Sequence, residues 1–300
     1  MTRASKTTRG ARERAGAGAR NRVRRFYDRT ADAESLRLDG DPYRRLERDM
    51  TVRTLARHLP ASARILDVGG GPGAYLEPLS SLGYDVSLCD LSTENVRLAR
   101  ARARQLGLAT PARRVRRADA TDLGHYADGT FDGALVAGPL YHLTDEILRA
   151  RAIAEVARVL RPGGVALFAL LPRLHPLRYL LREASPASRR CRDAIDWDQL
   201  LGDGNYRNPF GDGGDPTFFT DAHLSEVGDF EAHLRRAGWR VLETLSAESF
   251  CAFLDVPLGR WVRGEADYQR LLALVEKTAH RRDQIGAAEH VLVCARRRRA

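Results

Sequence analysis

The sequence contains almost no lysine, little cysteine and no long apolar stretch. Only Lys6 and Lys277 are lysines among 49 lysine and arginine residues, a bias that reflects codon composition as much as phosphate binding. The four cysteines are far apart and form no CxxC pair, which argues against a disulfide framework or a cysteine-based zinc site and favours a reducing, cytoplasmic location. No run approaches the roughly 18 apolar residues of a membrane span, so we expect no membrane association.

The net charge of +10 lies in the two ends of the chain. Residues 1–25 hold nine basic residues and one acidic residue, and residues 296–299 are four arginines, so the rest of the chain carries −2. A nucleic-acid-binding protein more often has a basic face on its folded domain, which disfavours nucleic acid as a partner. Residues 1–25 contain few large apolar residues and are predicted to be a disordered basic tail.

Strand and helix patterns alternate from about residue 42. An amphipathic helix is predicted over 42–60, followed by strands at 63–68, 84–90, 113–118, 131–137 and 164–171, with helices near 73–82, 92–107 and 145–160 between them. This alternation predicts an α/β fold with a mostly parallel sheet and helices on both faces. Ligands of such sheets bind beyond the carboxyl ends of the strands.

The alternation stops near residue 172 and resumes near 229. We therefore expect a core over 26–172, a substrate cap inserted at 173–228, and completion of the fold over 229–300, where the chain ends in the basic tail. The alternative for the insert is a packing element or a contact in a homodimer. Isolated aromatic residues favour an ordered cap: Tyr179, Trp197, Tyr206, Phe210, Phe218 and Phe219.

The stretch ILDVGGGPG at 65–73 has two competing interpretations. The spacing Gly69-x-Gly71-x-x-Ala74, with Asp90 about 20 residues further on, satisfies the fingerprint of dinucleotide-binding proteins. The same letters fit an acidic-glycine loop, Asp67-x-Gly69-x-Gly71-x-Gly73. In both, glycines let a nucleotide-like ligand approach the main chain beside a helix N-terminus.

Three features favour the second interpretation. Asp67 at the end of a buried strand would repel a pyrophosphate but attract a ligand with an ammonium group. Asp119, within Ala118-Asp119-Ala120 after the third strand, can accept a hydrogen bond from an adenine amine. Pro162-Gly163-Gly164 forms an expected turn between a helix and the fifth strand.

With these motifs, the chain resembles a class I S-adenosylmethionine-dependent methyltransferase over residues 64–172. The segments ILDVGGGPG, DLS, ADA, FDGALVAGPLYHL and LRPGG stand in order and are strongly specific together. The resemblance implies a Rossmann-like, mostly parallel seven-stranded sheet. It is closer to a bacterial small-molecule subgroup with a GPLYHL segment and an N-terminal FYD…E..RL segment, here 26–28 and 34–38. Ala118 departs from the glycine often found there.

The resemblance also implies a binding site for S-adenosylmethionine. Asp67 and the backbone at Gly69, Gly71 and Gly73 would surround the methionine part, and the two oxygens of Asp90 would accept the ribose hydroxyls. The alternative for Asp90 is a helix N-cap, a role that Ser92 can fill. The remaining expected contacts with the donor are Leu91 on the adenine face, Asp119 and Ala120 at its edge, the Gly138 carbonyl at the donor's amine, and Tyr27 over the donor. The alternatives are core packing for Leu91, a loop carboxylate for Asp119 and packing on the sheet for Tyr27.

His142 is the histidine expected beside the point of methyl transfer. It could take a proton from the acceptor, or it could only hold the loop by hydrogen bonds. Tyr141 is a candidate contact with substrate or donor. We expect no metal, because the histidines show no ligand spacing.

The loop after strand four also bears on the acceptor. Gly138-Pro139-Leu140-Tyr141 differs from the [Asn/Asp]-Pro-Pro-[Tyr/Phe] loop of enzymes that methylate base or glutamine amines. We therefore predict methylation of oxygen or nitrogen in a small molecule, such as a specialised metabolite. The alternatives are an RNA methyltransferase whose arginine-rich tails hold phosphates, a donor-binding protein with another role, and a nicotinamide dehydrogenase.

Overall fold

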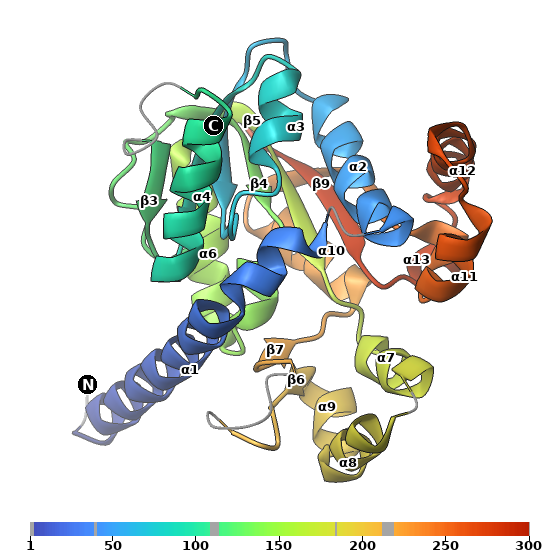
Figure 1. Cartoon of the computed structure of the whole chain (residues 1–300). Coiled ribbons are helices and arrows are strands. Elements are labelled where there is room, and N and C mark those ends of the chain that lie inside the picture. Colours follow the sequence, from blue (N-terminus) through green and yellow to red (C-terminus); the bar gives the residue numbers. More distant parts are fainter. Residues whose placement is uncertain (1–2, 39–40, 109–113, 184, 212–218, 300) are drawn as a thin grey trace.

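The computed structural model describes residues 3–38, 41–108, 114–183, 185–211 and 219–299, with side chains at residue 16 and from residue 18 onward. At its centre is a seven-stranded sheet (Figure 1). Its order is β3 (Val115–Arg117), β2 (Asp85–Asp90), β1 (Arg64–Val68), β4 (Phe131–Val136), β5 (Leu160–Leu170), β9 (Val291–Arg297) and β8 (Trp239–Ser246). The first five are parallel, and β9 runs antiparallel to β5 and β8.

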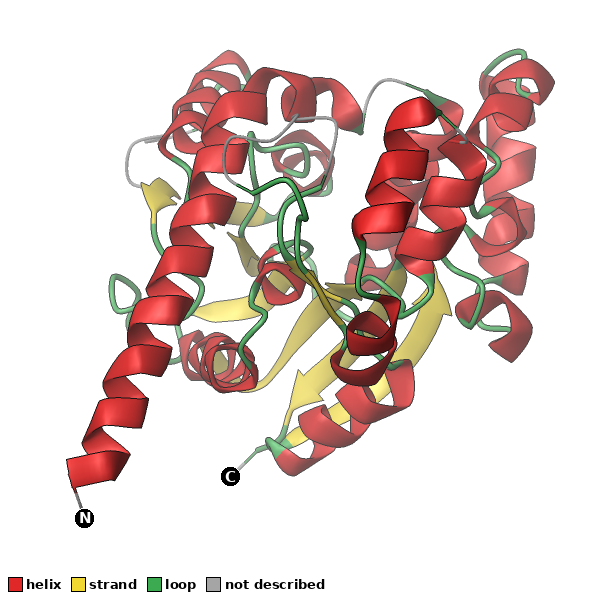
Figure 2. Cartoon of the chain, turned by 90° about the horizontal axis from the view of Figure 1, so that it is seen from below, coloured by secondary structure: helices red, strands yellow, loops and turns green. Residues whose placement is uncertain are grey.

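Helices cover both faces of this sheet (Figure 2). One face carries α2 (Pro42–Ala56), α3 (Leu76–Ser81), α4 (Thr93–Gln105) and α12 (Glu265–Thr278), and the other carries α6 (Glu146–Val159), α10 (Val227–Arg236) and α13 (Arg282–Ile285). Successive side chains of β1 point to opposite faces: Ile65 packs in one core with Leu46, and Leu66 in the other with Ile153. The predicted α/β fold with a mostly parallel sheet is confirmed.

The N-terminal segment differs from the prediction of a disordered tail over 1–25. Residues 3–25 belong to the long helix α1 (Arg3–Arg37), whose first half extends beyond the body of the molecule (Figure 1). Contacts distant in sequence explain its order from residue 16 onward. Val23 is buried, Arg20 pairs with Asp119, and Arg22 pairs with Asp221. Composition alone could not reveal these partners.

Residues 173–228 contain short elements beside the carboxyl edge of the sheet. These are α7 (His175–Glu183), α8 (Pro186–Ala194), α9 (Trp197–Asp203) and a ribbon of β6 (Asn205–Tyr206) and β7 (Ala222–His223). Tyr206 and Leu224 pack against Tyr141 and Leu171 of the core. Phe218, one of the predicted cap aromatics, lies outside the described residues. After β8, the chain continues through η2 (Ser249–Cys251) and α11 (Asp255–Trp261).

The turn predicted at Pro162-Gly163-Gly164 lies within β5. This strand begins at Leu160, and its register with β4 shifts between Phe131 and Gly133. Gly163 has a φ of 83°, in the left-handed region that favours glycine. The predicted turn is therefore a shift in register within β5, and from Val165 onward the strand pairs regularly with β4.

Candidate functional site

The glycine-rich loop follows β1 and turns through three left-handed glycines. Gly69, Gly71 and Gly73 have φ values of 71°, 56° and 88°. The Gly69 amide donates to the Cys89 carbonyl at 2.7 Å, which holds the loop to the end of β2. A Cβ atom at Gly73 would collide with the Leu76 side chain, so this glycine permits the turn into α3.

Asp67 is a buried carboxyl group that lacks a partner. Its side chain is fully buried, and neither of its oxygens has a hydrogen bond among the described residues. Burial, with a smaller contribution from the charge of Asp90, raises the pKa of Asp67 to about 8. An unpartnered buried carboxyl beside a cavity is costly unless a ligand satisfies it, and a cationic ligand group would do so best.

Asp90 ends β2 and organises the opposite side of the loop. Its Oδ2 accepts from the Gly71 amide at 2.9 Å, and its Oδ1 accepts from the Ser92 amide at 2.8 Å and from Asn95 Nδ2 at 3.3 Å. Burial raises the pKa of Asp90, and these donors oppose the rise. The N-cap of α4 is Ser92, so Asp90 is not needed for that role. Asn95 Oδ1 is buried, has no hydrogen-bond partner in the part of the chain that the structure describes, and offers a further acceptor.

Asp119 lies at the far end of the site, after β3. Its Oδ1 accepts hydrogen bonds from the Thr121 amide at 2.8 Å and hydroxyl at 2.7 Å. Its Oδ2 lies 3.1 Å from Arg20 Nε. Leu91 and Ala120 line the cavity beside this carboxylate. This end of the cavity therefore combines apolar side chains with a carboxylate that is paired with Arg20.

Helix α1 lies over these groups and is fastened to α4. Asp28 Oδ1 accepts from Ser92 Oγ at 2.7 Å and from the Thr93 amide at 3.0 Å. Its other oxygen pairs with Arg24 at 3.0 Å. A carboxylate at a helix N-terminus satisfies free amides and the helix dipole. Asp28 thereby holds α1 above the cavity, and Val23 and Tyr27 of the same helix line it.

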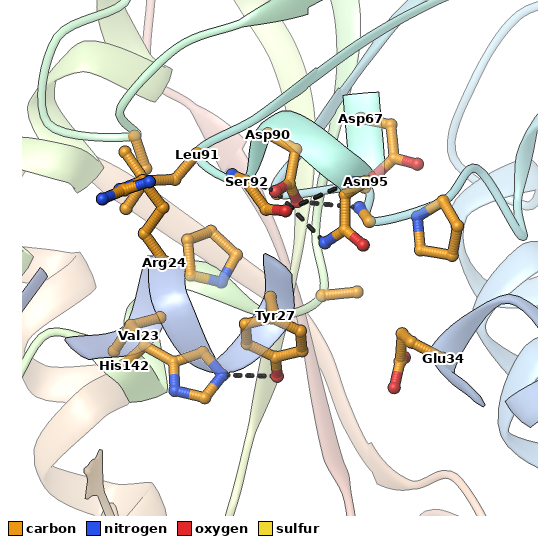
Figure 3. A pocket seen from close by; sticks show the side chains of 18 of the residues that line it. Val23, Arg24, Tyr27, Glu34, Asp67, Asp90, Leu91, Ser92, Asn95 and His142 are labelled. Atoms are coloured by element: carbon orange, nitrogen blue, oxygen red, sulfur yellow. Dashed lines mark hydrogen bonds between the residues drawn. The ribbon is translucent and has the colours of Figure 1, made fainter. Parts of the chain in front are cut away.

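His142 and Tyr141 lie in η1 (Pro139–His142), directly after β4. Tyr141 donates to the Ala137 carbonyl at 3.1 Å, and burial raises its pKa, so its hydroxyl holds the loop. His142 Nε2 lies 2.8 Å from the Tyr27 hydroxyl, and Nδ1 lies 3.3 Å from the Asp221 carbonyl (Figure 3). Burial lowers the pKa of His142 to about 4. The imidazole is therefore neutral near pH 7.

One cavity brings together eleven of the twelve predicted site residues. Gly73 is the exception, because it lies outside the lining. That its backbone surrounds the methionine part stays a prediction, beside its role in the turn. The predicted residues that line the cavity are Tyr27, Asp67, Gly69, Gly71, Asp90, Leu91, Asp119, Ala120, Gly138, Tyr141 and His142.

Sequence reasoning missed most of the lining that α1 contributes. Arg20 and Arg24 were expected in a disordered tail, yet they line the cavity. Glu34 and Arg37 also line it, and the FYD…E..RL resemblance was a signal that could have placed them. Asn95 was hidden within an ordinary helix pattern, one turn after Asp90.

Arg37 connects the cavity to a buried charged cluster. It pairs with Glu34 at 2.8 Å and with both oxygens of Glu47 at 2.6 and 3.1 Å. In this cluster, a carboxylate oxygen of Glu47, one of Glu248 and a ring nitrogen of His290 lie within 4.8 Å of one another, which is close enough to hold a metal ion together. Burial would lower the pKa of His290, but Glu47 and Glu248 raise it to about 9. Within this cluster His290 Nδ1 lies 2.8 Å from Glu248 Oε1.

Comparison with known proteins identifies the core of this fold. The family model described as a methyltransferase domain matches residues 66–168, about a third of the chain. A ubiquinone biosynthesis O-methyltransferase of Caulobacter sp. (strain K31) is 34% identical over 167 residues, covering 52% of this chain and 59% of the relative. The O-methyltransferase cnsE of Penicillium expansum is 34% identical over 154 residues, covering 50% and 51%. Residues 66–168 are thus similar to a methyltransferase domain, and the chain spans between half and three fifths of the length of these relatives.

The fold is shared across a wider range of proteins. A solved S-adenosylmethionine-dependent methyltransferase from Methanosarcina mazei matches 82% of this chain and 98% of its own, with a TM-score of 0.54 and 19% identity. At that identity the likeness concerns the fold. Within the described ranges, no helix combines the length and apolar character needed to cross a membrane.

Proposed function

We propose that the protein is an S-adenosylmethionine-dependent methyltransferase that acts on a small molecule. The single observation that carries this proposal is the unpartnered, fully buried carboxyl of Asp67 beside the glycine loop. A nicotinamide dinucleotide would bring a pyrophosphate to that loop, which would further oppose ionisation of Asp67 and would leave this carboxyl without a cationic partner. The ammonium group of S-adenosylmethionine would instead satisfy the carboxyl.

The residues present fit the rest of this donor. Asp90 and the free Oδ1 of Asn95 supply acceptors for ribose hydroxyls. Leu91 and Ala120 would contact the adenine faces, and Asp119 would accept from its amine. α1 would cover the donor and exclude water. These groups bind and orient, and no covalent intermediate on the protein is required.

The donor supplies an activated methyl group on a sulfonium sulfur. The protein must then hold the acceptor atom in line with that methyl group at about 3–3.5 Å. His142 and Tyr27 are the polar side chains beside the end of β4 that could receive a proton from the acceptor. Tyr141, whose hydroxyl is bound to the Ala137 carbonyl, is proposed to shape this region.

The proposed acceptor atom is oxygen, because both curated relatives described above are named O-methyltransferases. The same proposal includes three further points. The protein belongs to the small-molecule subgroup with the GPLYHL segment, it is located in the cytoplasm, and residues 173–228 serve as a substrate cap. A measurement of the molecular mass in solution would test whether the protein forms a homodimer. Each of these can fail without affecting the assignment of the donor.

Calorimetry with S-adenosylhomocysteine, the spent donor, tests the proposal. We expect binding in the micromolar range or tighter by the wild type, and none of NAD under the same conditions. Mass spectrometry after incubation with S-adenosylmethionine and a panel of hydroxylated aromatic compounds then tests the acceptor class. Absence of binding to S-adenosylhomocysteine would overturn the proposed function whatever the fold.

A further inference from the structure

Three segments that are distant in sequence meet at His142. Tyr27 comes from α1, His142 from η1 after β4, and Asp221 from the end of the cap. The Tyr27 hydroxyl lies 2.8 Å from Nε2, and the Asp221 carbonyl lies 3.3 Å from Nδ1. Figure 3 shows the tyrosine hydroxyl directed at the imidazole, across the cavity from Asp67, Asp90 and Asn95.

The partners fix where the protons lie. A carbonyl oxygen can only accept, so Nδ1 of His142 carries the hydrogen and donates to Asp221. Nε2 then carries a lone pair, and the Tyr27 hydroxyl donates to it. The result is a chain of two hydrogen bonds with one direction, from tyrosine through imidazole to carbonyl. In this tautomer Nε2 is the ring nitrogen at which the imidazole can accept a proton.

Asp221 is held firmly enough to orient the imidazole. Its Oδ2 pairs with Arg22 of α1 at 2.5 Å, and its Oδ1 accepts from the Asn208 amide at 3.0 Å. Asp221 is 6% exposed. The ring of His142 also contacts those of Tyr27, Tyr141 and Phe219, at centroid distances of 5.2, 4.8 and 5.3 Å. These contacts leave the ring little freedom to turn.

We propose that Tyr27 and His142 form a proton relay that accepts the proton of a hydroxyl acceptor, with Asp221 as the positioning residue. The inference rests on the proposed function and deepens it, because it assigns Tyr27 a catalytic role beyond covering the donor. It also names the acceptor class: a neutral hydroxyl compound, such as a phenol, that must lose a proton on methylation.

The step balances as follows. The acceptor oxygen forms a bond to the donor's methyl carbon while the carbon–sulfur bond breaks. The acceptor proton passes to the Tyr27 oxygen as the tyrosine proton passes to His142 Nε2. The products are a methyl ether, a neutral thioether and an imidazolium. Since burial raises the pKa of Tyr27, a free tyrosinate is unfavourable, and the two proton transfers must be concerted.

The activity test uses Tyr27→Phe and His142→Gln with catechol as the acceptor, because this phenol is neutral near pH 7. Tyr27→Phe keeps the ring that packs on Phe26 and His142. Tyr126→Phe is the matched control, because it removes a buried, unpartnered tyrosine hydroxyl that does not line the cavity. We expect each relay variant to lower kcat by about 10²–10⁴-fold near neutral pH and the control to stay near wild type. The kcat of the double variant should be no lower than that of the more impaired single variant, because the two groups act as a unit.

The pH profile separates a relay from a structural contact. Above the pH at which the phenol ionises in solution, the acceptor arrives without its proton, and the deficit of both variants should shrink. A deficit that is constant with pH, or a loss below about threefold for Tyr27→Phe, would overturn the relay. Affinity for S-adenosylhomocysteine should change less than threefold in each variant, and a larger change would assign Tyr27 to donor binding instead.

A readout without turnover is the ¹⁵N NMR spectrum of His142 in the complex with S-adenosylhomocysteine. We expect the neutral Nδ1–H tautomer at pH 7, and a ring protonated at Nε2 would contradict the relay. If the wild type binds S-adenosylhomocysteine but methylates no phenol, the hydroxyl acceptor and the relay fail while donor binding stands. If it does not bind S-adenosylhomocysteine, the proposed function itself fails.

Discussion

Asp28 Oδ1 accepts a hydrogen bond from Ser92 Oγ at 2.7 Å and thereby joins α1 to the first turn of α4. Ser92 is also the N-cap of α4 and follows Asp90, whose side chain organises the glycine loop. The helix over the cavity is therefore fixed to the strand end beneath it by one carboxylate. This relationship predicts how firmly the proposed donor is retained.

Removing this carboxylate should loosen α1. We expect Asp28→Ala to weaken binding of S-adenosylhomocysteine about fivefold, mainly by faster dissociation, since a lost cap of about 1 kcal/mol corresponds to that factor. Stopped-flow fluorescence or surface plasmon resonance measures the dissociation rate. Asp32→Ala, an exposed aspartate on the same helix, is the control and should leave the rate unchanged. Equal rates for wild type and Asp28→Ala would contradict the fastening role.

Asp67 should make the stability of the empty protein depend on pH. Its folded pKa of about 8 exceeds the usual value for aspartate, so the folded state retains a proton that the unfolded state loses. Its contribution therefore opposes folding increasingly from about pH 4 to pH 8, by up to about 1.4 kcal/mol per pH unit. Relative to Asp67→Asn, the wild type should lose free energy of unfolding across this window. Denaturant titrations at pH 5, 6, 7 and 8 measure the free energy of unfolding of both proteins. If the difference between wild type and Asp67→Asn is the same at every pH, the predicted protonation of Asp67 is wrong.

The same group should couple donor binding to proton release. In the empty protein Asp67 is mostly protonated at pH 7, whereas an ammonium group beside it would favour the carboxylate. Binding of S-adenosylhomocysteine between pH 6 and 7 should release close to one proton, and affinity should rise about tenfold per pH unit. Calorimetry in buffers of different ionisation enthalpy counts the protons. Affinity that does not change with pH over this range would show that no cation meets Asp67.

Asp90 should carry much of the affinity for the ribose. Asp90→Ala removes charge-assisted hydrogen bonds of roughly 1.5–3 kcal/mol each and also frees the Gly71 amide, so we expect at least a tenfold weaker affinity for S-adenosylhomocysteine. Circular dichroism checks that the sheet is retained. Asp85→Ala, at the opposite end of the same strand, serves as the control. Unchanged affinity for Asp90→Ala would refute the proposed orientation of the donor.

The sequence predicted the parts of the site that depend on local pattern. The strands, the glycine loop and the aspartates at the ends of β1, β2 and β3 follow from short motifs, and parallel strands bring their carboxyl ends together. The amphipathic face of α2 was also predicted correctly, with Tyr43, Leu46, Met50 and Leu55 buried.

Contacts that join distant segments could not be predicted in this way. Tyr27 and His142 are 115 positions apart, and His142 and Asp221 are 79 apart. The basic composition before residue 25 did not predict a helix. The helix in this segment is stabilised by ion pairs with Asp119 and Asp221, which lie far away in the sequence. For Gly73 the sequence leaves two roles open, because a glycine needed for a turn and a glycine needed for a ligand look alike in sequence.

The ion pair between Arg22 and Asp221 has a kinetic consequence. It connects the helix above the donor to the segment proposed to cover the acceptor, so α1 can lift only after this bridge opens. A donor bound first would be enclosed when the acceptor arrives, and the spent donor would leave last. The catalytic cycle should then follow a compulsory order, with competitive inhibition by S-adenosylhomocysteine against S-adenosylmethionine and noncompetitive inhibition against the acceptor.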